Sequence, residues 1–227
     1  MAIRDLADPF YLARRGLRMG IASHAAQLNG LLVDVGCGTR PYQDLFPQCR
    51  YVGLEVAQAS VHGSAKHADI LYDGRHIPIP DKMAGSVLCT QVLEHVFAPA
   101  AFLAEIRRIV SPGGKLLLTV PFVWDEHEQP YDFARYSSFG LRHLMEEAGF
   151  RIISHDKTLA DASVLVQLWL LSLFKLTARL PKLTRVLIFV LLAVPSNLLA
   201  RVFQALGPRN QDFYLDNIML CERNEHD

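Results

Sequence analysis

The chain has 227 residues, which is enough for one α/β domain with a sizeable hydrophobic core. Its 23 basic and 23 acidic residues balance, so no overall charge attracts nucleic acid and we expect no nucleic-acid partner. The four cysteines are scattered and include no C-x-x-C pair, which indicates neither a disulfide framework nor a metal site.

The first 30 residues are predicted to form an N-terminal helical cap. Asp8-Pro9 is a typical helix start, and Asn29-Gly30 ends the helix directly before an apolar run. The first five residues lack the apolar core of a signal peptide, and the scattered cysteines suit a reducing compartment. We therefore expect the protein to be cytoplasmic.

A buried parallel strand is predicted over Leu31 to Val35, followed by a glycine turn. The strand is apolar except for Asp34, as suits a strand that is covered on both faces. Gly36 and Gly38, on either side of Cys37, let the backbone turn sharply and approach a ligand because neither has a Cβ. Such a turn at the carboxyl end of the first strand is typical of a nucleoside cofactor pocket.

A second acid, Glu55, ends the next short apolar run, Arg50 to Glu55. An acid about 20 residues past the first strand suits binding of both ribose hydroxyls, since a carboxylate has two acceptor oxygens. The dinucleotide pattern G-x-G-x-x-G fails because Pro41 lies where its third glycine would be. A nicotinamide-dependent oxidoreductase is therefore disfavoured, although it stays an alternative.

The pattern Asp-x-Gly-x-Gly with an acid at the next strand tip resembles the class I S-adenosylmethionine-dependent methyltransferases, in their type 11-like branch. The resemblance implies a Rossmann-like α/β fold, whose seven-stranded sheet is mostly parallel with an antiparallel last strand. It also implies S-adenosylmethionine as the cofactor, with Asp34 receiving its amino group and Glu55 its ribose.

The resemblance covers about residues 31–157 and resumes at 213–223. Lys66 to Ile70 resembles the third strand, which brings an acid to the adenine amino group and an apolar side chain to the ring. Ser86 to Thr90 resembles the fourth strand, and Gln91 to Val96 resembles the segment that lies along the cofactor. A helix over Ala98 to Val110 and a fifth strand over Lys115 to Val120 are predicted next. The expected cofactor-binding residues are Asp34, Gly36, Cys37, Gly38, Glu55, Asp69, Ile70 and Gln91.

One departure from the family pattern is Arg40, which stands where a third glycine is frequent. Pro41-Tyr42 follows, so this loop is stiffer and bulkier than usual. Arg40 either reaches a carboxylate or phosphate near the mouth of the pocket, or it is a solvated loop residue. Arg40 and Tyr42 are therefore counted among the candidates for substrate binding.

The stretch 121–136 is predicted to be a loop that covers the pocket. It combines aromatic residues, four acids, a histidine and an arginine, and it resembles the H-E-x-P-x-D-x-x-R run of one branch of these methyltransferases. Chemistry of this kind in a loop beside a cofactor cleft indicates function. Trp124, Tyr131 and Arg135 are candidates for substrate binding, and Asp132 is expected to form a loop-ordering ion pair with Arg135.

Two histidines are candidates for a general base, which methyl transfer to a hydroxyl would need. His127 is the first, because an unperturbed imidazole titrates near neutrality. His95 is the second, because it lies just past the fourth strand. In the structural alternatives, His127 bonds Asp132 or a backbone carbonyl, and His95 caps the turn that follows it.

The insertion, residues 158–212, is strongly apolar. From residue 162 to 211 it contains no acid but six basic residues: Lys175, Arg179, Lys182, Arg185, Arg201 and Arg209. Helices are predicted over Ser163 to Leu176 and Arg185 to Leu206, with Pro195 breaking or kinking the second. Neither uninterrupted apolar stretch reaches the ~20 residues needed to cross a bilayer. We therefore expect an apolar helical hairpin before the last strand, without a membrane span.

Such a hairpin must be covered by protein or by lipid, because its surface is apolar nearly all round. Its positive charge favours anionic lipid, so we expect peripheral contact of residues 162–211 with the inner face of the membrane. A homodimer interface, a lid over the pocket and a place in the core are the alternatives.

The sequence thus predicts one domain over residues 1–227. It comprises the cap (1–30), a cofactor-binding core (31–157), the insertion (158–212) and a final strand (213–223). The predicted activity is methyl transfer from S-adenosylmethionine to an oxygen of a lipid-linked or membrane-presented acceptor. A soluble small-molecule acceptor and a non-catalytic cofactor-binding scaffold stay open as alternatives.

Overall fold

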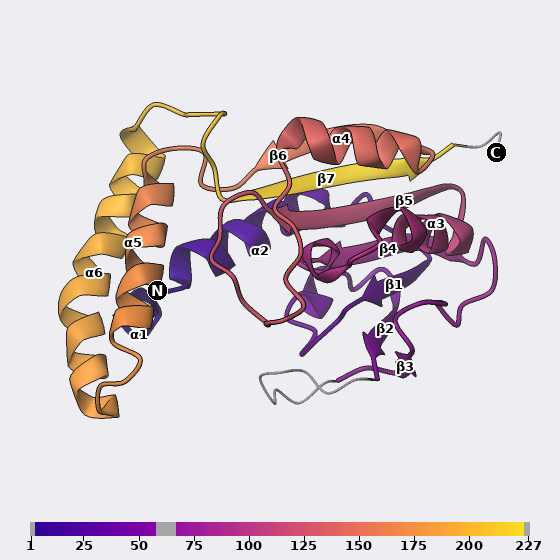
Figure 1. The fold of residues 1–227 in the computed structure, drawn as a ribbon. Helices are drawn as coiled ribbons and strands as arrows, with labels where there is room; N and C mark the ends of the chain where they lie inside the picture. The colour runs from indigo at the N-terminus through magenta and orange to yellow at the C-terminus, as the bar shows by residue number, and fades with distance from the viewer. Residues whose placement is uncertain (1–2, 58–66, 225–227) are drawn as a thin grey trace. The chain divides into compact units, whose positions relative to one another are not determined.

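The computed structural model describes residues 3–57 and 67–224, and the chain divides into two compact units. The sheet unit comprises residues 20–156 and 217–227. The helical unit comprises residues 1–19 and 157–216. Figure 1 labels the helices and strands of both units.

A seven-stranded sheet forms the centre of the sheet unit, with the strand order β3-β2-β1-β4-β5-β7-β6. Strands β1 to β5 pair in parallel and the last strand is antiparallel, so the predicted fold is confirmed. The strands are β1 (Leu31–Val35), β2 (Arg50–Val56), β3 (Ile70–Tyr72), β4 (Ala84–Thr90), β5 (Val110–Pro121), β6 (Phe150–Lys157) and β7 (Asp216–Arg223).

The strand order reverses between β1 and β4, which creates a crevice outside the carboxyl ends of these strands. The register pairs Asp34 with Gly53 and Val35 with Leu54, so the glycine turn leaves β1 beside the tip of β2. Leu54 pairs with Ile70 in turn, which places the start of β3 along the same edge. The sheet thereby gathers the predicted cofactor-binding segments at one end.

Alternating side chains of the buried strands enter two hydrophobic clusters, as the two-residue period of a strand requires. Val33 and Val87 belong to the larger cluster, together with helix α3 (Pro99–Ile109) and helix α4 (Ser138–Glu147). Leu32 belongs to a smaller cluster, which includes the last residues of helix α2 (Tyr11–Ala25). Covering both faces explains why β1, β4 and the second half of β5 are almost wholly apolar.

Two predicted elements differ from the observed ones. Strand β3 begins at Ile70 rather than at Lys66, which lies outside the described residues, because the ladder with β2 begins at the pair Leu54 and Ile70. Strand β5 begins at Val110 rather than at Lys115, and residues 111–114, which contain Pro112, Gly113 and Gly114, are an irregularity inside it. The register with β4 shifts there, so the extra residues bulge from the ladder instead of ending the strand.

The helical unit contains helix α1 (Ile3–Leu6), the first part of α2, helix α5 (Ser163–Leu176) and helix α6 (Lys182–Leu206). Leu170 of α5 packs against Phe189 and Ala193 of α6, which holds the hairpin together. The Phe10 ring meets the Phe174 ring edge to face, with centroids 4.9 Å apart. The N-terminal cap and the insertion therefore share one core.

Two buried amides fasten the N-terminal segment to this hairpin. The Gln167 side chain accepts from the Ala13 backbone N–H at 3.0 Å and donates to the Pro9 carbonyl at 2.9 Å. Asn197 Nδ2 donates to the Leu6 carbonyl at 2.8 Å. These bonds satisfy backbone groups at the start of α2 and the end of α1.

Helix α6 continues through Pro195, so of the two predicted effects, a break or a kink, the break is wrong. The helix begins three residues earlier than expected. Its 25 residues are long and apolar enough to cross a membrane, judged by length and composition alone. The expectation that this run is too short is therefore also wrong. The Ser196 hydroxyl donates to the Leu192 carbonyl at 2.7 Å, which helps to satisfy the backbone beside the proline.

Candidate functional site

The glycine turn after β1 is bound to the tip of β2. The N–H groups of Gly36 and Cys37 donate to the Leu54 carbonyl at 2.9 and 3.0 Å. Gly36 has φ +77°, and a Cβ there would lie 2.4 Å from Cγ2 of Val92, so a larger residue does not fit. Gly38 has φ +50°, and no described atom beyond its chain neighbours lies within 4 Å of an added Cβ. The turn is thus closed toward the protein at Gly36 and open to a ligand at Gly38.

Asp34 is the buried acid directly before this turn, with 1% of the residue exposed. The Tyr51 hydroxyl donates a hydrogen bond to Asp34 Oδ2, whereas Oδ1 has no hydrogen-bond partner among the described residues. Burial raises the pKa of Asp34 to about 7, against the opposing effect of the Tyr51 bond. A cationic group at Oδ1 would therefore satisfy a buried acceptor and favour its ionised form.

Sequence reasoning missed Tyr51, although the strand pattern contains a signal for it. Side chains alternate between the two faces of a strand, so residues 51, 53 and 55 share one face of β2. The parallel register sets Asp34 beside Gly53. Gly53 has no side chain, so nothing at that position separates the Asp34 carboxyl from the Tyr51 hydroxyl. Register, rather than composition, thus identifies Tyr51 as the partner of Asp34.

Glu55 binds the turn from the second strand. Its Oε2 accepts from the Gly38 N–H at 3.0 Å, and its Oε1 accepts from the Val56 N–H at 3.0 Å. Each carboxylate oxygen has a second lone pair, so Glu55 can still accept hydrogen bonds from a ligand. Its predicted role at a ribose is compatible with these contacts and stays a prediction.

Arg40 points toward the neighbouring acid Asp69, and Arg40 Nη2 lies 2.7 Å from Asp69 Oδ2. That oxygen also accepts from the Gly53 N–H at 2.9 Å. The hydrogen bond to Asp69 raises the pKa of Arg40, and the same bond lowers the pKa of Asp69. Arg40 thus reaches a carboxylate, as one alternative predicted, and its largely buried side chain is not a solvated one.

Arg40 has φ +56°, a conformation that favours glycine. This explains why a glycine is frequent at that place in the family pattern, and why the larger residue departs from it. Asp69, expected at an adenine amino group, is instead engaged by Arg40 and stays about half exposed. An adenine would share this carboxylate with the guanidinium.

The chain leaves β4 at Gln91, which has φ +54°. The Gln91 N–H donates to the Thr119 carbonyl at 2.9 Å, and the Gln91 side-chain amide donates to the Thr119 hydroxyl at 3.2 Å. Ile70 packs at the margin of the larger hydrophobic cluster, and Tyr42 packs against the smaller one. These side chains are therefore positioned by the core, and their predicted ligand contacts stay predictions.

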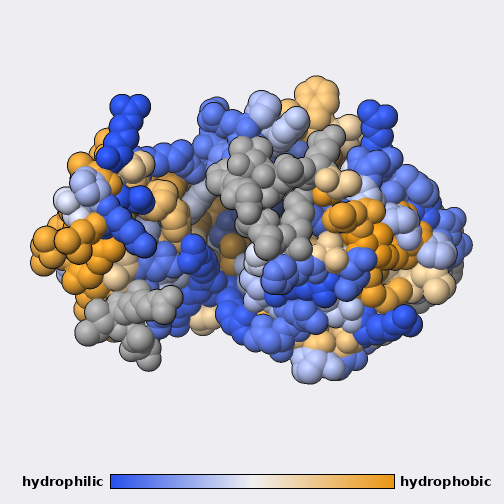
Figure 2. Space-filling model, turned by 90° about the horizontal axis from the view of Figure 1, so that it is seen from below, coloured by the Kyte–Doolittle hydropathy of each residue, from blue (hydrophilic) through white to orange (hydrophobic). Residues whose placement is uncertain are grey.

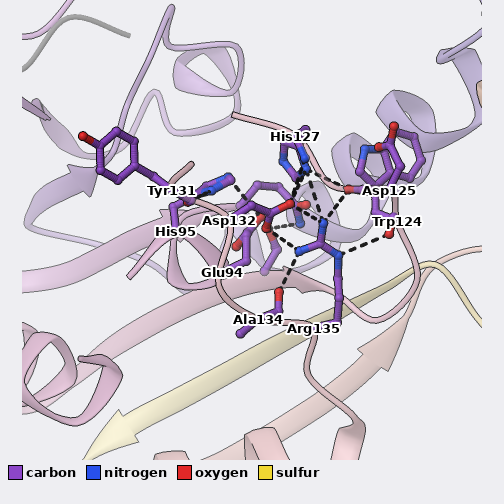
Figure 3. A network of polar contacts seen from close by, with 11 residues as sticks. Glu94, His95, Trp124, Asp125, His127, Tyr131, Asp132, Ala134 and Arg135 are labelled. Carbon is purple, nitrogen blue, oxygen red and sulfur yellow. Dashed lines mark hydrogen bonds and ion pairs between the residues drawn. The ribbon is translucent and has the colours of Figure 1, made fainter. Parts of the chain in front are cut away.

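Loop 122–137, the connection between β5 and α4, is ordered by a network around Arg135 (Figure 3). Arg135 binds Asp132 with both terminal nitrogens, at 2.6 and 2.7 Å, which confirms the predicted ion pair. Its remaining N–H groups donate to the carbonyls of Trp124, Asp125 and Ala134. All five donors of the guanidinium thus have acceptors in the loop, which makes Arg135 a positioning residue.

The same network fixes the charge of Asp132. Burial opposes its ionisation, but hydrogen bonds from the Arg135 guanidinium and the His127 backbone N–H outweigh burial, and the pKa of Asp132 falls to about 2. Asp132 is therefore an anion over the physiological pH range. It holds the loop and is not a proton acceptor near neutrality.

The two histidine candidates lie together, although 31 residues separate them in the sequence. Their ring centroids are 4.8 Å apart and the planes meet at 82° (Figure 3). His95 Nδ1 lies 2.7 Å from the Tyr131 carbonyl oxygen, and His127 Nδ1 lies 3.1 Å from the Asp125 carbonyl oxygen. The structural alternative for His127, a bond to a backbone carbonyl, is therefore present, and it leaves the Nε2 atom of either ring to act as a base.

Exposed aromatic side chains surround this pair. Tyr131 is 53% exposed, and Phe97 meets Phe133 edge to face with centroids 5.3 Å apart. Phe97 and Phe133 were not among the predicted site residues. Their exposure beside the histidines makes them candidates for binding an apolar acceptor.

Comparisons with known proteins show what this chain is similar to. Residues 33–118 match the family model described as "Methyltransferase domain". A probable S-adenosylmethionine-dependent methyltransferase of Mycolicibacterium smegmatis is 30% identical over 135 residues, which are 53% of this chain and 52% of that protein. A malonyl-[acyl-carrier protein] O-methyltransferase of Alcanivorax borkumensis is 27% identical over 100 residues, 39% of this chain and 34% of that protein.

Among solved structures, phosphoethanolamine N-methyltransferase 2 of Haemonchus contortus, in complex with S-adenosyl-L-methionine, is similar with a TM-score of 0.57. It is 13% identical, and the match covers 93% of this chain and 52% of that one, so it supports the fold alone. This chain spans about half or less of the length of the first curated relatives that it matches.

Proposed function

We propose that this chain, which belongs to the class I S-adenosylmethionine-dependent methyltransferases, methylates an oxygen of a lipid-linked or membrane-presented acceptor. The family match and the strand order confirm the predicted family and fold, and S-adenosylmethionine as the cofactor of that family. The comparisons do not establish the acceptor or the oxygen nucleophile, which are our proposal.

The residues at the tips of β1 and β2 fit this cofactor. The buried Asp34 Oδ1, which lacks a partner among the described residues, suits a cationic amino group. The open side of Gly38 gives room for a ligand against the backbone, and Glu55 can accept from hydroxyls. When bound there, S-adenosylmethionine supplies a methyl group that its sulfonium already activates.

The protein's own contribution is then alignment and proton removal. Holding the acceptor oxygen in line with the methyl group can contribute ~7–11 kcal/mol of the barrier. The Arg135–Asp132 network gives loop 122–137 a fixed shape for this purpose. His127 is the first candidate for removing the hydroxyl proton and His95 the second, each through Nε2.

The surface of the insertion supports an acceptor in a membrane. Helix α6 exposes a set of large apolar side chains, and hydrophobic residues gather at the left of Figure 2, where α5 and α6 lie. The exposed members in α6 are Leu183, Val186, Leu187, Val190, Leu191, Leu192, Leu198, Leu199, Val202 and Leu206. Six basic residues and no acid accompany them over residues 162–211, and each Lys or Arg near an anionic surface contributes about 1 kcal/mol.

Cofactor binding is tested by calorimetric titration of the whole chain with S-adenosylhomocysteine and, separately, with NAD. The first should bind and the second should not. Asp34→Asn should abolish binding, whereas Asp161→Asn, a change of the same kind in the helical unit, should not alter it. Binding of NAD, or S-adenosylhomocysteine binding that survives Asp34→Asn, would contradict the proposal.

Membrane contact is tested by flotation with vesicles of phosphatidylglycerol and of phosphatidylcholine. The protein should float with the anionic vesicles, and Lys182→Glu with Arg185→Glu should reduce flotation at least 10-fold. A matched reversal in the sheet unit, Arg142→Glu with Arg151→Glu, should leave flotation unchanged. Protein that stays in the soluble fraction with both vesicles would favour a soluble acceptor, and a stable dimer would favour an interface role for α6.

A further inference from the structure

Glu94, His95 and His127 form a cluster in the sheet unit whose ligand-competent atoms all lie within 4.8 Å of one another. Glu94 and His95 are consecutive residues of the short 3-10 helix η2 (Leu93–His95), and His127 comes from loop 122–137 (Figure 3). His95 Nε2 lies 4.0 Å from Glu94 Oε1. We propose that this cluster binds a divalent transition-metal ion through two imidazoles and one carboxylate.

The hydrogen bonds of the two rings prepare them as ligands. His95 Nδ1 lies 2.7 Å from the Tyr131 carbonyl oxygen, which can only accept, so Nδ1 carries the proton and donates it. His127 Nδ1 lies 3.1 Å from the Asp125 carbonyl oxygen and 3.3 Å from Asp132 Oδ2. Each Nε2 then keeps its lone pair, which is the arrangement that orients metal-binding histidines.

Arg135 Nη2 also lies near His127 Nδ1, at 3.4 Å. Its two protons already have acceptors at 2.5 Å on Asp125 and at 2.7 Å on Asp132. These contacts are shorter than the one to the ring, so they take the protons of Nη2. The guanidinium therefore does not donate to His127 Nδ1, which keeps its proton and leaves the lone pair on Nε2 for the metal.

Charge around the cluster favours a cation. Glu94 is completely buried, and the positive charge of Arg135 interacts with three carboxylates, those of Glu94, Asp125 and Asp132. The backbone N–H groups of Phe133 and Ala134 donate to the Glu94 carbonyl at 2.8 and 3.2 Å. Loop 122–137, which contains His127, is thus hydrogen-bonded to Glu94, which supplies the carboxylate.

The ligand set indicates the class of metal. Two imidazoles and one carboxylate suit Zn²⁺, Co²⁺ and related ions, whereas Mg²⁺ prefers oxygen ligands in an octahedral arrangement. Ligand atoms of a tetrahedral site with bonds of about 2.1 Å are about 3.4 Å apart, so the side chains must close in by about 1 Å. His95 and His127 retain some exposure, 18% and 30% of their side chains, which allows this rotation.

Three protein ligands leave a coordination position open for a further oxygen. Val92, two residues before Glu94, contacts the glycine turn, since a Cβ on Gly36 would lie 2.4 Å from it. The cluster is thus near the proposed cofactor pocket, where an ion would bind the acceptor oxygen and lower the pKa of its hydroxyl. With the ion bound, both Nε2 atoms are ligands, so the lowered pKa of the hydroxyl replaces proton removal by His127 or His95. This role rests on the proposed methyl transfer, whereas ion binding itself does not.

The test uses the whole chain, free of any affinity tag and stripped of metal. Titration with Co²⁺, followed by visible absorption, should give one equivalent with ligand-field bands, and Zn²⁺ should displace it. Mg²⁺ should not compete. His127→Ala and Glu94→Gln should each weaken Co²⁺ binding at least 10-fold. His143→Ala, which removes an exposed histidine of α4, should not change it.

Thermal unfolding of each variant checks that it is folded. The same measurement gives a second test of ion binding, because bound Zn²⁺ should raise the melting temperature of the wild type and not that of His127→Ala. S-adenosylhomocysteine is titrated into the same preparations. Cofactor binding without Co²⁺ binding would overturn the metal site and leave the proposed function standing. Co²⁺ binding that persists in both His95→Ala and His127→Ala, or that His143→Ala weakens equally, would also overturn the site.

Discussion

Replacing Asp34 by Asn should separate stability from cofactor binding. The wild-type carboxyl is buried with an unpartnered oxygen, and its pKa is about 7 in the folded protein against an ordinary value near 3.8. Between these values the folded state holds a proton that the unfolded state has released, so stability falls as pH rises. The loss is about 1.4 kcal/mol per pH unit well below pH 7, and about 2 kcal/mol in total between pH 5 and pH 7, because the group is half ionised at pH 7.

Asn is uncharged and has nearly the same shape, and its amide oxygen can still accept from Tyr51. Asp34→Asn should therefore lack the fall in stability over this pH range, and the ligand-free variant should be more stable than the wild type above pH 7. Urea unfolding of both proteins at pH 5, 6, 7 and 8 measures the difference.

Cofactor binding should be lost in Asp34→Asn, although the ligand-free variant is the more stable protein above pH 7. A saturating ligand at 100 times its dissociation constant stabilises a protein by about 2.7 kcal/mol, and S-adenosylhomocysteine should do so for the wild type only. Parallel pH profiles for the two ligand-free proteins would refute the reasoning about the buried carboxyl. Equal stabilisation of both by the ligand would refute the role of Asp34 in binding.

Four further substitutions test the remaining parts of the structure. Gly36→Ala should lower the free energy of unfolding by about 1–3 kcal/mol in urea denaturation, because of its positive φ and the clash with Val92. Gly38→Ala should mainly weaken S-adenosylhomocysteine binding, which calorimetry would measure. Arg135→Ala should reduce turnover at least 10-fold with an unchanged S-adenosylhomocysteine dissociation constant, and faster hydrogen exchange in loop 122–137 should accompany it. Gln167→Ala should cost about 1–3 kcal/mol in urea unfolding, because two buried backbone groups lose their partners.

The strands and the glycine turn could be predicted because their signals are local. A run such as Leu31 to Val35 is apolar on both faces, and its glycines mark the next turn within a few residues. The acid on β2 follows at a spacing that the strand–helix–strand geometry sets. The extent of β5 was harder, because Gly113 and Gly114 carry a turn signal that pairing with β4 overrides as a bulge.

The contacts between side chains could not be predicted, because folding sets them across long sequence distances. Arg40 meets Asp69 only because the turn after β1 passes the start of β3. His95 and His127 meet only because loop 122–137 bonds to the Glu94 backbone. The sequence argument about metals considered cysteine pairs alone, so it contained no signal for a site that joins two distant segments.

Besides its apolar contact between α5 and α6, the helix hairpin of the insertion buries amides and exposes large apolar side chains, which is unusual for a soluble helix pair. Its amides Gln167 and Asn197 are completely buried, whereas Leu183 and Leu206 are each more than 80% exposed. A soluble hairpin buries its apolar stripe and exposes its amides, because unpaired apolar surface is unfavourable in water. Here the Gln167 amide and Asn197 Nδ2 bond to backbone groups of the N-terminal segment, and large apolar side chains lie on the outside. Exposed apolar surface of this kind is unfavourable in water. The six basic residues without an acid are the reason for proposing anionic lipid as its covering.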